Sequence, residues 1–533
     1  MKWFSMRMLA QWARITDAGD VILETAGQKS HRQILQALGG LLMALFIATL
    51  SSTVVATALP KIIGAVHASQ TAYTWVVTAT LLTATAAMPI WGKLADLFSK
   101  KALVQTAILV FLAGSLACGF SQNAGELIAA RAVQGVGVGG LQALVQIAIA
   151  AMISPRERGR YSGYQSSATA LATVGGPLLG GAIVDTSWLG WRWCFFIGIP
   201  IGILALFILQ RTLKLPTIRR EEVRIDYLGA TLLTAGVSVL LIWISFVDTS
   251  FAWVSWQTAA LVAASLALLA VALVVESRVA EPVVPLGIVR QRIVTLAIVG
   301  SLAAGTAMYG SSVFLSQYFQ VSRGYSPTQA GSLTIPMMVG LLISSIVAGN
   351  LISRFGKIKP FIIAGTVLLA VGFGALGTID HTTSLLFVSA AMLLIGFGMG
   401  MTVQNFTLVV QNAVPLKDIG AASSTVSFFR SLGGTIGVSV LGAVLARQVA
   451  SGIAHRHVSA PVAYGDATGH IFIISAVVAV VGVVAAVLLK PVPLRTSIDL
   501  PEEIQSAAVA AGAADGAPTA AQLPTEAASP GRV

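Results

Sequence analysis

The sequence predicts an all-α integral membrane protein, and both its composition and the length of its apolar segments support this prediction. Of the 533 residues, 56% are hydrophobic and only 10% are charged, whereas about 25% of the residues in a soluble domain are charged. The apolar residues gather in about fourteen segments of roughly 18 or more residues, the length that a helix needs to cross a bilayer. Because a compact core cannot hide so much apolar surface, the lipid bilayer is the expected solvent of this chain.

The predicted spans follow one another along the chain with short connections. They lie near residues 36–59, 73–91, 102–120, 126–152, 160–184, 193–212, 227–247, 258–275, 293–320, 328–352, 361–379, 385–411, 421–446 and 470–489. Both cysteines, Cys118 and Cys194, fall within these spans. They are interpreted as small core residues, so neither a disulfide framework nor a metal site is predicted, and no cofactor is expected.

Lysine and arginine residues favour alternate loops. The even-numbered loops hold 18 of the 33 basic residues, whereas the odd-numbered loops hold five. Because basic loops stay on the cytoplasmic side, the even-numbered loops and both termini are predicted to be cytoplasmic. The net charge of +12 is explained by this topology, and no nucleic-acid partner is predicted.

Three pairs of glycine-containing segments recur at nearly one offset, which indicates an internal duplication. The pairs are Gly92–Lys101 with Gly349–Lys357, Gly175-Gly176 with Gly433-Gly434, and Gly135–Gly137 with Gly396–Gly398, at offsets of 257, 258 and 261 residues. Two six-span halves with two extra spans between them account for these offsets. Parallel repeats around a central cavity are typical of transporters.

This duplication divides the chain into five parts. They are a cytoplasmic segment at 1–35, a six-helix bundle at 36–212, a linker with two extra transmembrane helices at 213–292, a second six-helix bundle at 293–490 and a cytoplasmic tail at 491–533. The tail is rich in Ala, Pro and Glu and is predicted to be disordered.

Two arginines lie inside predicted spans: Arg131 in the fourth and Arg430 in the thirteenth. A central Arg costs on the order of 2.5–3.5 kcal/mol to insert, so each should face a wet cavity or a partner. Glu126 does not share a face with Arg131, because five residues correspond to about 140° around a helix. The alternative for each arginine is a structural tie to carbonyl groups of another helix.

Polar side chains form stripes on two spans. With Arg131 at 0°, Gln134, Gln142 and Gln146 fall at about 300°, 20° and 60° around the helix. The ninth span has a similar stripe, made by Tyr309, Ser312, Ser316 and Gln320. Hydrogen bonds between helices are the alternative. We favour a substrate cavity, because long polar side chains are hard to hide in a membrane.

Two segments are predicted to act as a conformational gate. In the fifth span Gly175, Gly176, Pro177 and Gly180 permit close helix contact and a bend, with plain close packing as the alternative. The other segment is the loop after the second span. Its gate residues are Gly92, Asp96 and Lys100.

Asp96 is expected near the positive N-terminal end of a neighbouring helix, such as the one that follows Pro360. There it would lock the two halves together on the cytoplasmic side. The alternative is that the basic residues around Asp96, including Lys100, only set the topology.

These segments resemble motifs of the major facilitator superfamily, and more narrowly of its fourteen-span drug:proton antiporter family. Gly92–Lys101 resembles the signature loop of the superfamily, Leu127–Gly137 its fourth-span motif and Gly175–Gly181 the antiporter motif of the fifth span, while Ile225–Gly229 resembles the start of the first extra span. The resemblance implies export of amphipathic drugs from a bacterial cytoplasm across the cell membrane. It also implies alternating access by rocking halves, driven by protons.

Ser51 departs from the family pattern, since the fourteen-span relatives usually carry an aspartate at this position; Leu97 and Ser99 also stand where Arg and Gly are common in the signature loop. No Asp or Glu lies deep in any predicted span, although a proton carrier needs a titratable group. Arg131 with Glu126 or Asp185, through tertiary contact, is therefore the predicted proton-coupling set. Neutral or weakly charged substrates should be favoured over dications.

Other functions are compatible with the same residues or are excluded by them. Dedicated export of an endogenous metabolite or lipid, or transport without proton coupling, would use the same motifs. No phosphate-binding Gly-x-x-x-x-Gly-Lys-Ser/Thr loop occurs, so an ATP-driven pump is not supported. No cluster of nucleophiles or metal ligands indicates an enzyme. The sequence leaves the oligomeric state open.

Overall fold

The computed structural model describes residues 31–65, 70–186, 189–213, 226–247, 251–279, 286–415 and 418–491, together with 282, 284 and 494. Residues Gln36–Ser497 form one compact unit, which holds the transmembrane helices. The predicted cytoplasmic segment at 1–35 and the predicted tail at 491–533 lie almost wholly outside the described residues.

The described residues are almost entirely helical. In chain order the elements are α2 (His31–Ala65), α3 (Gln70–Leu97), α4 (Lys100–Phe120), α5 (Ala124–Met152), α6 (Pro155–Asp185), α7 (Trp193–Phe196), α8 (Gly198–Thr212), α9 (Tyr227–Phe246), α10 (Trp256–Glu276), α11 (Leu286–Val289), α12 (Arg292–Gln317), the π-helix η1 (Tyr318–Ser322), α13 (Pro327–Leu333), α14 (Ile335–Phe355), α15 (Lys359–Leu376), α16 (Leu385–Ala413), α17 (Ile419–Arg456) and α18 (Ala460–Leu488).

The helices confirm the predicted membrane-spanning fold. Within the described residues, 13 helical segments are long and apolar enough to cross a membrane. A further apolar stretch, Leu228–Ile244 of α9, is shorter and corresponds to the seventh predicted span. Together they account for the fourteen predicted spans.

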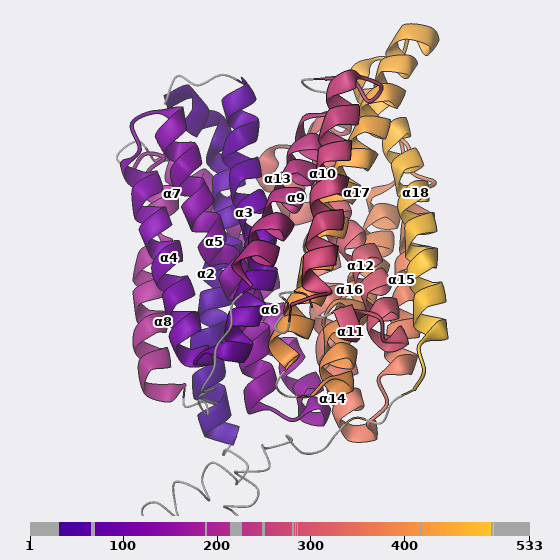
Figure 1. Ribbon diagram of the computed structural model, residues 1–533. Helices are drawn as coiled ribbons and strands as arrows, with labels where there is room; N and C mark the ends of the chain where they lie inside the picture. Colours follow the sequence, from indigo (N-terminus) through magenta and orange to yellow (C-terminus); the bar gives the residue numbers. More distant parts are fainter. Residues whose placement is uncertain are drawn as a thin grey trace, which may run out of the picture. The chain divides into compact units, whose positions relative to one another are not determined.

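The helices pack into two groups, which we call the N-terminal bundle (α2 to α8) and the C-terminal bundle (α12 to α18). In the first, α5 packs on α3 and α4, and α4 packs on α8; in the second, α16 packs on α14 and α15, and α18 packs on α12 and α15 (Figure 1). Contacts of α3 with α17 and of α6 with α14 join the bundles. Two bundles with two helices between them confirm the predicted fold class.

The same close helix contacts recur in both bundles, as a duplication requires. A Cβ atom on Gly135 would overlap the carbonyl of Thr80, and one on Gly396 would overlap the carbonyl of Met337. Further equivalent pairs are Gly139 with Ala84 and Gly400 with Leu341, and Gly137 with Phe111 and Gly398 with Leu369. Only glycine allows backbones this close. The offsets between these pairs match those found in the sequence.

The last two spans extend further than predicted. Helix α17 continues to Arg456 and α18 begins at Ala460. The apolar pattern instead places the end of the first span near 446 and the start of the second near 470. His457 makes the turn between them with a φ of 52°. Residues 447–456 include Arg447, Gln448, Ser451, His455 and Arg456, which interrupt the apolar pattern although the helix continues through them.

The extra helix α9 covers the seam between the bundles. It packs on α3 and on α17, and α10 packs on α9. Val237 and Leu241 of α9 form a buried cluster with Met88 of α3 and Phe428 of α17. The first of the two extra spans is therefore in contact with both bundles, and the sequence had left its role open.

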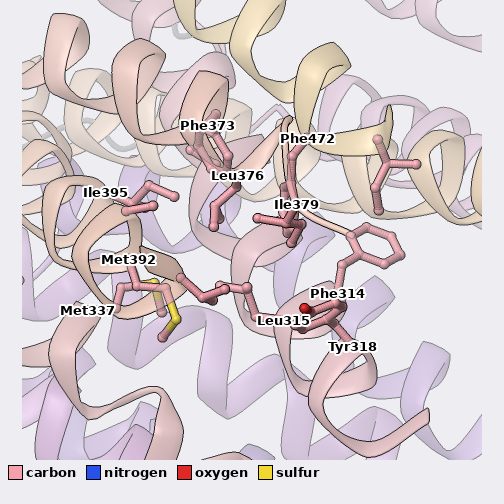
Figure 2. Close-up of a cluster of buried hydrophobic side chains, with 14 of the residues drawn as sticks. Phe314, Leu315, Tyr318, Met337, Phe373, Leu376, Ile379, Met392, Ile395 and Phe472 are labelled. Atoms are coloured by element: carbon pink, nitrogen blue, oxygen red, sulfur yellow. The ribbon is translucent and has the colours of Figure 1, made fainter. Parts of the chain in front are cut away.

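One apolar core of the C-terminal bundle lies between α12, α14, α15, α16, α17 and α18. Phe373 and Phe472 stack with ring centroids 5.9 Å apart, and Met392 and Ile395 lie nearby (Figure 2). The hydroxyl of Tyr318 donates a hydrogen bond to the carbonyl of Asp380 at 2.8 Å, which satisfies the polar end of this buried ring.

Candidate functional site

Arg131 is held inside the N-terminal bundle by neutral groups. Its side chain is 3% exposed. Its Nε donates to the carbonyl of Val76 at 3.2 Å, and its Nη1 donates to Gln134 Oε1 at 2.6 Å. Gln134 Nε2 donates in turn to Ser115 Oγ at 2.7 Å and to Ser51 Oγ at 3.1 Å. We call Ser51, Ser115, Arg131 and Gln134 the Arg131 set.

The duplication shows which side chains can fill the place of the Arg131 set when only packing matters. Gly114 lies against the backbone of Gln134, and Gly372 lies against Ile395 in the same way. The equivalent contacts of Thr53 with Gly176 and of Tyr309 with Gly434 give an offset of 256 residues between α2 and α12. This offset and those of 258 and 261 place Ala307, Phe373, Met392 and Ile395 of the C-terminal bundle at the positions of the Arg131 set, and all four belong to its buried apolar core. Phe373, Met392 and Ile395 are labelled in Figure 2. Apolar side chains therefore fill this place in one half of the fold. Packing alone does not require the polar ones in the other half.

Ser51 belongs to the Arg131 set, which the sequence did not predict. The family pattern marked Ser51 only as a missing aspartate. The structure places its hydroxyl within hydrogen-bond distance of Gln134, although the two residues are 83 positions apart. A sequence pattern along single helices cannot show this contact between α2 and α5.

The structure does not bring Glu126 to Arg131. Glu126 is exposed and lies in the first turn of α5, where its two carboxylate oxygens accept hydrogen bonds from the Gln122 backbone and the Asn123 side chain, both at 2.7 Å. Its own N–H donates to Asn123 Oδ1 at 3.0 Å. These contacts cap the helix, so the tertiary contact that was expected between Glu126 and Arg131 is not found. The side chain of Asp185 lies outside the described residues.

The other predicted cavity residues of α5 lie in different surroundings. Gln142 is partly buried. Gln146 is buried, and its Nε2 donates to Gln404 Oε1 of α16 at 2.8 Å. This bond joins the two bundles, so the stripe that begins at Arg131 inside one bundle ends at the interface between them.

The predicted stripe of the ninth span is mainly satisfied within its own helix. Ser312 donates to the carbonyl of Met308 at 2.9 Å, and Gln320 Nε2 donates to Ser316 Oγ at 3.0 Å. Tyr309 is the exception, because its ring packs against Gly434 of α17.

Arg430 also lies on α17, one turn before Gly434. Its Nη1 donates to the carbonyl of Val403 on α16 at 3.3 Å. A tie to a carbonyl of another helix was the structural alternative for this arginine, and that is the contact found. Arg430 and Tyr309, both predicted to line a cavity, therefore lie close together where α12, α16 and α17 meet.

Asp96 joins the bundles at one end, which we call the Asp96 end. Its Oδ1 accepts a hydrogen bond from the Gly420 N–H at 2.8 Å, and its Oδ2 accepts one from the Ala421 N–H at 2.7 Å. Both donors lie in the first turn of α17, where free N–H groups and the helix dipole attract a carboxylate. The expectation of a helix N-terminus was correct, but the choice of α15 after Pro360 was wrong.

Two glycines make this contact possible. A Cβ on Gly92 would overlap Ser424, and a Cβ on Gly420 would overlap Asp96. Lys100 begins α4 and is partly buried. The partner was misassigned because the packing of α3 on α17 joins helices far apart in sequence, which no local pattern reveals.

The glycine-rich segment of the fifth span lies in one unbroken helix, α6. Gly176 packs directly against Thr53 of α2, and the hydroxyl of Thr53 donates to the carbonyl of Ala172 at 3.1 Å. Gly175 is partly buried and Gly180 is buried. The side chain of Pro177 lies outside the described residues. Close packing, the alternative to a hinge, is what these contacts show.

Arg158 is a buried residue that the sequence pattern places among the basic loop residues. Arg158 is 6% exposed, and its Nε donates to the carbonyl of Ile153 at 2.7 Å. Its Nη1 crosses to the C-terminal bundle and donates to Gln411 Oε1 at 3.0 Å. Burial lowers the pKa of Arg158 to about 9, so the group stays charged at neutral pH. Charge counting assigns such a residue to topology because it cannot detect burial.

Comparison with known proteins agrees with this architecture. The family model described as Major Facilitator Superfamily matches residues 41–438. The chain belongs to the major facilitator superfamily. It is therefore a multi-pass membrane transporter rather than an enzyme, and its substrates are small molecules.

Several curated members of the superfamily are similar in sequence. Multidrug transporter protein MdtP of Bacillus subtilis is 36% identical over 422 residues, which cover 79% of this chain and 76% of the relative. Multidrug resistance protein 3 of Bacillus subtilis is 29% identical over 405 residues, covering 76% and 78%. The acurin A biosynthesis cluster MFS-type transporter of Aspergillus aculeatus is 30% identical over 429 residues, covering 79% and 77%.

Solved structures share the fold at low sequence identity. The human organic anion transporter MFSD10 matches with a TM-score of 0.60 and 14% identity, covering 85% of this chain and 99% of that one. The proton:xylose symporter XylE matches with a TM-score of 0.60 and 16% identity, covering 89% and 99%.

Proposed function

We propose that this transporter exports amphipathic small molecules from a bacterial cytoplasm by alternating access. The contact of Asp96 with the first turn of α17 carries this proposal, because it joins the two bundles at one end by bonds that can break. The similarity to MdtP of Bacillus subtilis, a multidrug transporter by name, supports drugs as the substrate class. With the termini on the cytoplasmic side, the Asp96 end faces the cytoplasm and is closed in this conformation.

Exchange for protons is part of the proposal, and the Arg131 set is its proposed centre. Protonation and release must change a hydrogen-bond network that both sides of the membrane can reach in turn. Ser51 provides no carboxylate, and the carboxylate of Glu126 caps α5. Asp185 is therefore the remaining carboxylate of the predicted set. Without a fixed negative charge beside Arg131, neutral or weakly charged drugs are favoured over dications.

Proton movement in liposomes tests this function. The full-length protein is reconstituted with a pH-sensitive dye inside, a proton gradient is imposed, and neutral, monocationic and dicationic drugs are added. Drug-dependent proton movement that is lost in Arg131→Ala supports antiport. Arg160→Gln, a change at an exposed position, serves as the control. Saturable drug flux without proton movement would reject proton coupling and retain export.

A dedicated exporter of one metabolite or lipid is the second candidate. The 30% identity to the acurin A biosynthesis cluster transporter favours it. Competition in the same liposomes separates the two candidates. Mutual inhibition by chemically unrelated drugs supports multidrug export, whereas inhibition by a single chemical class supports a dedicated exporter.

A further inference from the structure

A small polar cavity lies between the two bundles near the Asp96 end, where α5, α6 and α16 meet. Its volume is about 30 Å³, enough for about two water molecules. Polar side chains from both bundles line it, among them Gln146, Arg158, Gln165, Gln404, Thr407 and Gln411.

Two hydrogen bonds cross this cavity, and both run in the same direction. Gln146 Nε2 donates to Gln404 Oε1 at 2.8 Å, and Arg158 Nη1 donates to Gln411 Oε1 at 3.0 Å. The N-terminal bundle thus provides the donors, and the C-terminal bundle provides the acceptors. If the bundles part at this end, one wall presents a guanidinium and an amide N–H, and the other presents two amide oxygens.

Contacts within each bundle hold these side chains in place after such a separation. Arg158 is anchored to its own bundle by bonds to the carbonyls of Ile153 and Ala150. Gln411 is anchored to its own bundle by a bond from its Nε2 to Ser423 Oγ at 3.0 Å. The free donors of Arg158 would therefore remain aimed at the opened space, with little loss of side-chain entropy on binding.

One polar group of the cavity has no protein partner within the described part of the chain. Thr407 is 1% exposed, and its hydroxyl makes no hydrogen bond there. An unpaired buried hydroxyl costs free energy, and this one belongs to a residue in the wall of the cavity.

We propose that this cavity is the closed form of a cytoplasmic substrate site, in which Arg158 and Gln146 bind the carboxylate of an amphipathic substrate. The planar guanidinium suits a carboxylate in geometry and charge. The carboxylate takes the place of Gln411 and Gln404 as acceptor, so a bound substrate holds this end open and closure follows when the substrate moves deeper. This inference rests on the proposed export function.

A matched pair of dyes tests the site. Transport and binding are measured with the full-length protein in liposomes, using rhodamine B, which carries a carboxylate, and its ethyl ester, which does not. We expect the wild type to bind the acid about tenfold more tightly than the ester, a factor that one charge-assisted hydrogen bond can supply. Arg158→Gln should remove this preference, and Arg158→Lys should restore part of it. Arg160→Gln, at an exposed position in the same turn region, should leave it unchanged.

Gln411→Ala provides a second test that keeps Arg158 anchored. It removes the competing acceptor, so the KM for the acid should fall while that for the ester stays the same. An equal change for both dyes in Arg158→Gln and an unchanged ratio in Gln411→Ala would overturn the proposal. If the ester is exported without any preference for the acid, the site fails and the export function stands. If neither dye is exported but the acid preference in binding persists, the export function fails and the site stands.

Discussion

Arg131 illustrates how a buried charge can indicate function when no titratable partner is visible. Its guanidinium contacts a carbonyl and the amide of Gln134, and the same place in the other bundle is filled by apolar side chains. Replacing a buried polar group by a well-packed apolar one is often neutral or stabilising. The N-terminal bundle therefore retains polarity here at a cost in stability.

This comparison between halves predicts the effect of a fourfold exchange. The exchange gives the Arg131 set the residues of its repeat equivalents: Ser51→Ala, Ser115→Phe, Arg131→Met and Gln134→Ile. Single Arg131→Met leaves the Gln134 carbonyl without its donor and should cost about 1–3 kcal/mol. The fourfold variant should regain that stability but lose drug-dependent proton movement. Thermal unfolding in detergent measures the first effect, and a fourfold variant no more stable than Arg131→Met would contradict it.

Ser51→Asp tests the meaning of the missing aspartate. The new carboxylate would lie near Gln134 Nε2, which bonds Ser51 Oγ at 3.1 Å, and within reach of the Arg131 charge. A fixed negative charge near the path should raise dication export relative to neutral drugs. Flux of a dicationic and a neutral drug in the same liposomes measures the ratio. An unchanged ratio in a folded, active variant would mean that the residue at position 51 does not determine charge selectivity. Ser52→Asp, one position along α2, is the control.

At the scale of single elements, the sequence predicts well where the helices lie but poorly which helices pack against each other. Apolar length locates every span, and the glycine echoes predict the duplication that the helix contacts confirm. The sequence does not show which helices contact one another. Asp96 binds the first turn of α17 rather than that of α15, and Arg158 donates a hydrogen bond to α16. Both contacts join helices separated by more than 200 positions, and they depend on tertiary packing.

Asp96→Asn should weaken closure at the Asp96 end. A neutral side chain keeps one acceptor oxygen but loses the charge that interacts with the first turn of α17, worth about 0.3–2 kcal/mol. Ser424 is fully buried beside Gly92, so a cysteine placed there reports on opening. Labelling of Ser424→Cys by a water-soluble maleimide should become severalfold faster in Asp96→Asn.

Two features of the chain make this measurement clean. The native cysteines, Cys118 and Cys194, are both buried and should add little background labelling. Asp418→Asn is the matched control, because Asp418 precedes α17 without a side-chain cap bond. Equal labelling rates in Asp96→Asn and the parent would show that the carboxylate does not hold this end closed.

At the scale of the whole molecule, the contacts between the bundles are the ones that the proposed alternating access has to break. Asp96 with α17, Arg158 with Gln411 and Gln146 with Gln404 all join the bundles toward one end. None is a buried ion pair, so each can be exchanged for water or substrate at a modest cost. Helix α9 contacts both α3 and α17, so a relative motion of the bundles would change the contacts of this extra span.

A reversible cross-link between the bundles tests whether that motion is required. Ser166 of α6 and Ser345 of α14 face each other with their hydroxyls 2.8 Å apart, so cysteines at these two positions would place their sulfur atoms side by side. Ser166→Cys with Ser345→Cys should lose drug export on oxidation and regain it on reduction, because a covalent tie prevents the bundles from separating. Each single cysteine variant is the control and should transport equally under both conditions. Full export by the completely cross-linked protein would mean that these two helices stay together throughout transport, and rocking of the bundles about their interface would have to be abandoned.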